Sequence, residues 1–137
     1  MSRPVVRAIV LDTAALSALA RGSGSTMARL SAAHDMDVPV VFPAVVLAEI
    51  MTGGPADAAV WRIVNRISPI DITVGIASHA GRLRENAESV RRKKRDLTVD
   101  AVVAASALEL APCLLVTGDP DDMILLTAGS GVKVVRA

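Results

Sequence analysis

Four acidic residues stand alone in segments of the chain that are otherwise apolar. Asp12 follows VVRAIVL, Glu49 interrupts PAVVLAEIM, Asp100 opens DAVVAASAL, and Asp119 follows CLLVTG. No Lys or Arg lies within four residues of Asp12, Glu49 or Asp119. Because an ionised carboxylate taken out of water must be paired or must bind a metal, four lone buried acids predict a shared divalent cation.

The type of ligand indicates which cation this would be. Carboxylate oxygens with no histidine or thiol nearby favour Mg²⁺ or Mn²⁺ over zinc, and a cluster of four could hold one ion or two. Such an ion activates a water molecule and neutralises charge on a phosphodiester during in-line displacement. The four acids therefore predict a metal-dependent enzyme in which they are the metal ligands and the catalytic residues.

Each acid also has a purely structural interpretation. The sequence DPDD at 119–122 has the pattern of a helix start, with a capping acid, a proline at the first position and acids in the first turn. Asp12 could likewise cap a helix, and Asp100 could complement a helix dipole. Glu49, whose neighbours are apolar, is the hardest to explain in this way. Singly these signals are weak, and only together do they favour a shared site.

The elements that would position the acids alternate between strands and helices. We expect strands over residues 5–11, 38–42, 67–72, 113–117 and 132–135. We expect helices over residues 13–20, 26–34, 43–51, 55–66, 74–89, 99–110 and 119–129. Pro43 and Pro55 fit the first turns of two helices, and Thr98 fits an N-cap. This alternation predicts an α/β fold with a parallel sheet covered on both faces.

The expected sheet offers a place where the acids could meet. In an open parallel sheet, ligands bind beyond the carboxyl ends of the strands, at the point where the strand order reverses. Asp12 follows the first expected strand and Asp119 follows the fourth, while Asp100 and Glu49 lie on neighbouring helices. We therefore expect the four to converge on one rim, where, without metal, mutual repulsion would raise at least one pKa.

Composition limits the remaining possibilities. Hydrophobic residues make up 52% of the chain, which excludes disorder, and the only aromatic residues are Phe42 and Trp61. The single cysteine, Cys113, excludes an internal disulfide and fits a buried strand. No signal peptide and no run of roughly 18–20 apolar residues is present, so we expect a soluble, cytoplasmic protein.

One basic run is a candidate for contact with a nucleic-acid backbone. It consists of Arg91, Arg92, Lys93, Lys94 and Arg95. An isolated run of this kind could equally be a solvated loop or helix end. Because it directly precedes Asp100 in the sequence, it could border the acidic site, and we take it as a candidate substrate contact.

Four blocks of the sequence resemble the PIN-domain ribonucleases, and in particular the VapC-type toxins of bacterial toxin–antitoxin pairs. The blocks are VLDTAALSAL, AVVLAEI, LTVDAVVAASALE, and LLVTGDPDDM followed by VKVV. The resemblance covers essentially the whole chain. It implies a single PIN-like domain over residues 1–137, with a three-layer α/β/α fold and a five-stranded, mainly parallel sheet. It also implies Mg²⁺- or Mn²⁺-dependent endoribonuclease activity on cellular RNA.

The resemblance also assigns residues by position. The family's acidic quartet matches Asp12, Glu49, Asp100 and Asp119. Asp122 is a candidate fifth metal ligand, although the choice between Asp121 and Asp122 is open. Thr117 matches a hydroxyl that accompanies such sites, and Thr13, beside Asp12, is a candidate for a supporting part.

The implied partners are a second copy of the chain, in a homodimer, and a cognate antitoxin that wraps the toxin and obstructs its cleft. Trp61, near Asp57 and Arg62, is the better candidate for an antitoxin contact, whereas Met51 fits ordinary core. Two alternatives stay open. One is a non-catalytic protein-interaction or RNA-binding module of the same fold, and the other is a PIN-type nuclease of RNA processing with no antitoxin.

Overall fold

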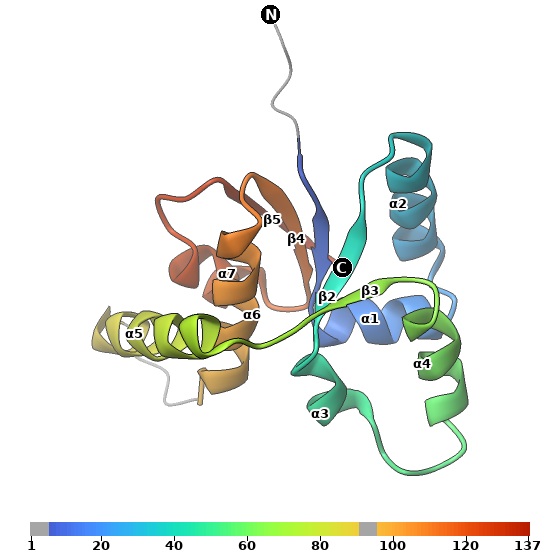
Figure 1. Ribbon diagram of the computed structural model, residues 1–137, viewed down its shortest axis with the longest axis horizontal. Coiled ribbons are helices and arrows are strands. Elements are labelled where there is room, and N and C mark those ends of the chain that lie inside the picture. The colour runs from blue at the N-terminus through green and yellow to red at the C-terminus, as the bar shows by residue number, and fades with distance from the viewer. Residues whose placement is uncertain (1–5, 91–95) are drawn as a thin grey trace, which may run out of the picture.

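The computed structural model describes residues 6–90 and 96–137, and its ribbon is drawn in Figure 1. Its strands are β1 (Ile9–Leu11), β2 (Val40–Pro43), β3 (Ser68–Ile70), β4 (Cys113–Thr117) and β5 (Val132–Arg136). Its helices are α1 (Thr13–Ala20), α2 (Gly24–Asp35), α3 (Val46–Ile50), α4 (Asp57–Val64), α5 (Val74–Val90), α6 (Thr98–Glu109) and α7 (Pro120–Leu126). Each expected strand and helix therefore has a counterpart in the structure, in most cases with shifted ends.

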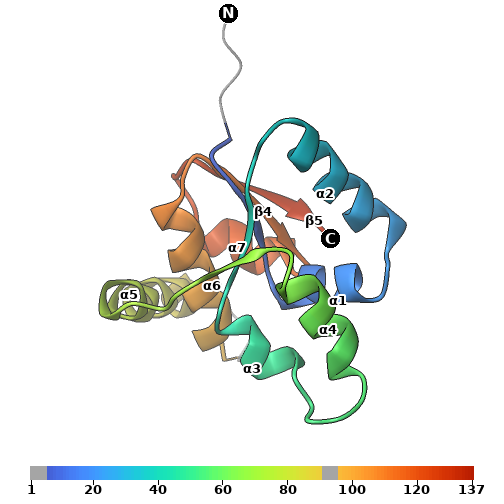
Figure 2. The ribbon, with the colours of Figure 1, turned by 45° about the vertical axis from the view of Figure 1, so that its right-hand side comes forward.

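The strands form one parallel sheet between two layers of helices. The strand order is β3-β2-β1-β4-β5, and every pairing is parallel. Figures 1 and 2 show α1, α2 and α4 on one side of the sheet and α5, α6 and α7 on the other. Helix α3 lies at the end where β2 finishes. The three-layer α/β/α architecture predicted from the sequence is confirmed.

The central strand explains why the sequence has no alternating pattern there. In β1, Ile9 pairs with Val40 of β2 on one side and with Leu114 of β4 on the other. All three β1 residues are buried, because helices cover both faces of the strand. Phe42 and the predicted strand residue Cys113 are also buried. None of the helices in the described part of the chain is long and apolar enough to cross a membrane.

Two expected helix starts are wrong, and each has a local cause. Pro43 ends β2 instead of opening a helix, because pairing with β3 continues through it and the Ala44 amide donates to the Ile70 carbonyl at 2.9 Å. Helix α4 begins at Asp57 and not at Pro55. The Asp57 carboxylate accepts the amides of Thr52 and Gly53 and so holds the preceding residues in a loop.

The expected N-cap at Thr98 is also one position off. Leu97 occupies the N-cap, and Thr98 is the first helical residue of α6. The Asp96 carboxylate accepts the Thr98 amide at 2.9 Å and the Thr98 hydroxyl at 2.7 Å. The acid two residues before the helix therefore bonds its first amide, whereas a threonine at the N-cap would bond the amide of the second or third helical residue.

Candidate functional site

The ends of β1 and β4 lie side by side at the point where the strand order of the sheet reverses. From β1 the chain proceeds to β2 and β3 on one side, whereas β4 and β5 lie on the other side. Asp12 directly follows β1, and Asp119 follows β4 after Gly118. This is the position at which open parallel sheets bind their ligands.

A cavity of about 650 Å³ opens at this rim. Its wall includes all four acids of the predicted quartet, namely Asp12, Glu49, Asp100 and Asp119. The cavity is also lined by Thr13 and Ser17 of α1 and by Arg21, the C-cap residue of this helix. The expected convergence of the four acids on one rim of the sheet therefore matches the geometry, although their roles remain predictions.

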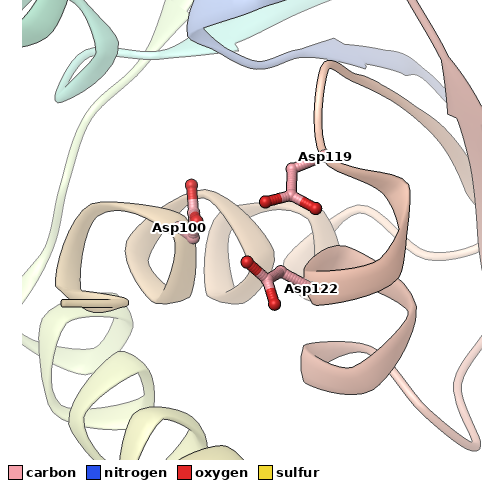
Figure 3. Close-up of side chains that lie close together, drawn as sticks. All are labelled: Asp100, Asp119 and Asp122. Carbon is pink, nitrogen blue, oxygen red and sulfur yellow. The ribbon is translucent and has the colours of Figure 1, made fainter. Parts of the chain in front are cut away.

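Three carboxylates form the tightest group. Asp100 in the first turn of α6, Asp119 before α7, and Asp122 in the first turn of α7 offer oxygens that all lie within 4.8 Å of one another. Figure 3 shows the three side chains directed toward a common space between the two helices. Such an all-oxygen donor set suits a hard cation such as Mg²⁺ or Mn²⁺. The residues present thus fit the metal that the sequence predicts.

This grouping bears on the open choice between Asp121 and Asp122. Asp122 is three residues after Asp119, so the start of α7 brings both onto one face, and Asp122 is only 7% exposed. Asp121 is exposed, and it is not among the carboxylates that gather within 4.8 Å in the described part of the chain. The geometry therefore favours Asp122 as the additional ligand.

Asp12 combines the structural and the functional interpretation. As the N-cap of α1, it accepts the Ala15 amide at 3.0 Å, and its second oxygen accepts the Gly118 amide at 3.2 Å. Burial raises the pKa of its carboxyl group, and hydrogen bonds from Thr117, Ala15 and Gly118 lower it in part. A raised pKa was expected, but its main cause is burial and not repulsion within the cluster.

Thr117 and Gly118 hold the two strand ends together. The buried Thr117 hydroxyl bonds to Asp12 and accepts the Asp119 amide at 3.0 Å. A Cβ atom on Gly118 would lie 2.6 Å from the Ala14 Cβ, a distance that real Cβ contacts do not reach. Gly118 was not among the residues predicted for the site, although a glycine beside Asp119 indicates a close approach of the backbone.

The expected burial of all four acids is wrong. Asp12 is buried, Asp100 and Asp119 are half-buried, and Glu49 is exposed. Glu49 lies near the end of the five-residue helix α3 and accepts the Thr13 hydroxyl at 2.5 Å. Its apolar neighbours do not bury it, because so short a helix at the rim leaves one side to solvent. The supporting part expected of Thr13 is thus a hydrogen bond to Glu49.

The remaining candidate residues are distributed as follows. Trp61 is 49% exposed on α4, and Met51 is half-buried after α3. The candidate substrate contacts Arg91, Arg92, Lys93, Lys94 and Arg95 lie outside the described residues. Ser17 and Arg21 were missed, although their spacing of four and eight residues from Thr13 would place them on one helix face.

An α/β fold with a carboxylate site at the reversal of strand order defines a broad class of proteins, and the sequence narrows it. The family model of the PIN domain matches residues 9–125. The chain therefore belongs to the PIN domain family. No curated protein matches it in sequence.

Solved structures with the same fold are also similar over nearly the whole chain. One is VapBC2 from Rickettsia felis bound to a DNA fragment from its promoter. It has a TM-score of 0.73 at 16% sequence identity, over 94% of this chain and 98% of that one. A toxin–antitoxin complex from Klebsiella pneumoniae has a TM-score of 0.64 at 22% identity, over 91% and 95%. FitAcB from Neisseria gonorrhoeae has a TM-score of 0.60 at 20% identity, over 92% and 95%. At these identities the similarity establishes the shared fold.

Proposed function

We propose that this chain is a Mg²⁺- or Mn²⁺-dependent endoribonuclease that acts as the toxin of a toxin–antitoxin pair and hydrolyses phosphodiester bonds in cellular RNA. The observation that carries the proposal is the group formed by Asp100, Asp119 and Asp122 at the point where the strand order of a PIN-family sheet reverses. One carboxylate oxygen from each of the three lies within 4.8 Å of the other two. Carboxylate sites of this kind support metal-assisted displacement at phosphorus.

The acidic side chains of the cleft have different roles in this proposal. Asp100, Asp119 and Asp122 would hold the cation, which supplies an acidified water and neutralises phosphate charge when bound. Asp12, fixed by two amides and with a raised pKa, is positioned to complete the ligand set or to accept a proton at its carboxylate. Glu49 is held toward the same cleft by Thr13.

The toxin assignment rests on the similar structures. The one from Klebsiella pneumoniae is described as a toxin–antitoxin complex, and the chain covers 95% of that relative. We extend this association to the present chain as part of the proposal, with a cytoplasmic location, a homodimer and a cognate antitoxin as partner. The half-exposed Trp61 on α4 is a suitable anchor for such a partner, because tryptophan is enriched among the few residues that contribute most of the binding energy at protein interfaces.

The experiment is a cleavage assay on total bacterial RNA with Mg²⁺, with Mn²⁺ and with chelator. We compare the wild type with Asp119→Asn, which removes a carboxylate of the three-acid group, and with Asp121→Asn, which removes an exposed carboxylate two residues away. Discrete, metal-dependent fragments should appear with the wild type and Asp121→Asn and be absent with Asp119→Asn. Equal cleavage by all three proteins would point to a contaminating ribonuclease and contradict the proposal.

A second candidate is a non-catalytic binding module of the same fold. The observation in its favour is that Asp12 caps α1, so this acid has a structural task without any metal. Titration calorimetry with Mn²⁺ separates the two. The nuclease should bind Mn²⁺ and lose this binding in Asp119→Asn, whereas the binding module should show no heat in either protein.

A further inference from the structure

One face of α1 carries a row of polar side chains along the cleft. Thr13, Ser17 and Arg21 are spaced four residues apart, so the helix places them on one face, and all three line the cavity that holds the acids. Thr13 bonds to Glu49, and Ser17 accepts a hydrogen bond from Arg21 Nη1 at 2.8 Å. The row therefore begins at the acids and ends in a guanidinium group.

We propose that Arg21, positioned by Ser17, binds a phosphate of the RNA next to the phosphate that is cut. This rests on the proposed nuclease function and adds a substrate-binding residue to it. The Arg21 guanidinium bonds to Ser17, and the four residues from Thr13 to Ser17 rise about 6 Å, so this group lies about one helical turn along the wall from Thr13. At that separation the guanidinium serves a neighbouring phosphate, because the acids surround the cut one.

The charge of the cleft creates the need for such a contact. Asp12, Glu49, Asp100 and Asp119 all line it, and an acidic wall repels a polyanion. A bound cation offsets this repulsion at the acids and does less further along. Arg21 is the basic side chain that the described residues contribute to this wall. Arginine suits the task because its planar group binds phosphate oxygens in pairs.

The surroundings of Arg21 leave its guanidinium group able to bind a phosphate. Its bond to Ser17 uses one of the five N–H donors of a guanidinium, and the side chain is exposed. Ser17, Arg21 and Ile50 also line a second cavity of about 370 Å³, next to α4. The two cavities meet at these three residues, so an RNA strand that leaves the acids along α1 would pass Arg21.

Helix α5 offers a matched control. There Arg82 Nη1 donates to Ser78 Oγ at 3.0 Å, again over four residues and again on an exposed side chain. This pair has the geometry of Ser17 and Arg21 but does not line the acidic cavity. Replacing Arg82 thus controls for the loss of one positive charge and one Ser–Arg hydrogen bond.

The test measures RNA binding and cleavage separately. Binding of a labelled, mixed-sequence RNA oligonucleotide is followed in Ca²⁺, and single-turnover cleavage of bacterial RNA in Mg²⁺ or Mn²⁺, for the wild type, Arg21→Ala, Arg21→Lys and Arg82→Ala. Arg21→Ala should weaken binding about tenfold, raise the protein concentration for half-maximal cleavage to the same extent, and leave the maximal rate within about twofold. Its salt slope should fall by about 1, since one phosphate contact is lost.

The control variants should respond in a graded way. Arg82→Ala should match the wild type, and Arg21→Lys should recover part of the binding because it retains charge without the planar fork. Arg21→Gln, which keeps a donor for Ser17 but no charge, replaces the alanine variant if that one unfolds, and it should bind as weakly.

The possible failures are distinguishable. If the wild type cleaves RNA in a metal-dependent way and Arg21→Ala equals Arg82→Ala in binding and salt slope, the Arg21 contact is refuted and the nuclease function stands. A fall in the maximal rate with unchanged binding refutes it too. If the wild type neither binds nor cleaves RNA, both proposals fail.

Discussion

Two aspartates of this protein both accept hydrogen bonds from backbone amides, and yet folding shifts their pKa values in opposite directions. Asp12 accepts the amides of Ala15 and Gly118 at the rim of the sheet. Asp57 accepts the amides of Thr52 and Gly53 in the loop before α4. Burial raises the pKa of Asp12, whereas the Thr52 and Gly53 hydrogen bonds lower the pKa of the partly exposed Asp57.

The difference means that the ionised carboxylate of Asp57 stabilises the fold, whereas the ionised carboxylate of Asp12 does not. A lowered pKa means that the folded state favours ionised Asp57. A raised pKa means that the folded state favours protonated Asp12, so its charge at neutral pH is destabilising without a metal. Carboxylates whose pKa is shifted by burial are common at functional sites. The two pKa shifts therefore agree with the functional role proposed for the rim near β1 and β4 and with a structural role for the loop at 52–57.

The largest test of this contrast is Asp12→Asn. We expect RNA cleavage to fall by more than about 100-fold, since replacing a residue that only supports a metal ligand already costs 10- to 100-fold. Asparagine can accept only one of the two amides that Asp12 accepts, but the raised pKa shows that the cost of the buried charge outweighs these hydrogen bonds. The unfolding free energy of the metal-free variant should therefore exceed that of the wild type at neutral pH. Cleavage assays and urea unfolding measure the two effects.

The sign of the pH dependence provides the control. Folding raises the Asp12 pKa above 3.8, so the stabilisation by its proton is complete below 3.8 and is lost as the pH rises through the folded-state value. The advantage of Asp12→Asn should therefore shrink on acidification. A metal-free variant that is less stable than the wild type at neutral pH would show that Asp12 is a structural cap like Asp57.

Cys113 sharpens the contrast, because a raised pKa alone does not mark a site. Burial raises the pKa of this thiol from 9.0 to about 11, which lowers its thiolate fraction at neutral pH about 100-fold. A thiol is neutral at that pH in either case, so its burial carries no strain, and its sulfur donates to the Ala107 carbonyl. Alkylation should be at least about 100-fold slower in the native protein than in urea. Fast native alkylation would mean that β4 opens at this end.

Gly118→Ala tests whether the rim is packed in order to place Asp12. The new Cβ would lie 2.6 Å from the Ala14 Cβ, so α1 or the strand end must shift, and we expect a loss of about 1–3 kcal/mol in unfolding free energy and lower activity. Gly81→Ala on α5, where a Cβ has open space, should instead stabilise by roughly 0.5–1 kcal/mol.

A double variant makes the steric explanation specific. Ala14→Gly removes the atom that the new methyl group meets, so Ala14→Gly with Gly118→Ala should lose less stability than the sum of the single losses. Strict additivity would contradict the contact.

The fold could be predicted from the sequence more completely than the candidate site. Continuous apolar runs such as β1 and β4 are unmistakable, because a parallel strand is buried on both faces. Asp12 and Asp119 could be placed because an acid directly after such a run must lie at the sheet rim. The distinction between Asp121 and Asp122 depends on the helical phase of α7, which starts only at Pro120.

Other features depend on tertiary context and were missed or misjudged. Glu49 was expected to be buried because its neighbours are apolar, but burial depends on the length and position of α3. Pro43 has the signature of a helix start and yet ends a strand, since pairing with β3 overrides the local signal. Arg21 carries no signal by itself and becomes notable only when α1 is seen to line the acids.

The smallest expected effect is that of Asp57→Asn, and it completes the contrast. The variant should be less stable than the wild type at neutral pH, because asparagine cannot accept every hydrogen bond that Thr52 and Gly53 donate to the carboxylate. Folding lowers the Asp57 pKa below 3.8, so this stabilisation is complete above 3.8 and is lost as the pH falls through the folded-state value. Urea unfolding of the two proteins along a pH series should thus converge on the acid side, whereas the gap between wild type and Asp12→Asn has the opposite sign. If Asp57→Asn proved more stable than the wild type at neutral pH, the loop clamp would carry strain of the same kind as the rim, and the distinction between the two aspartates would fail.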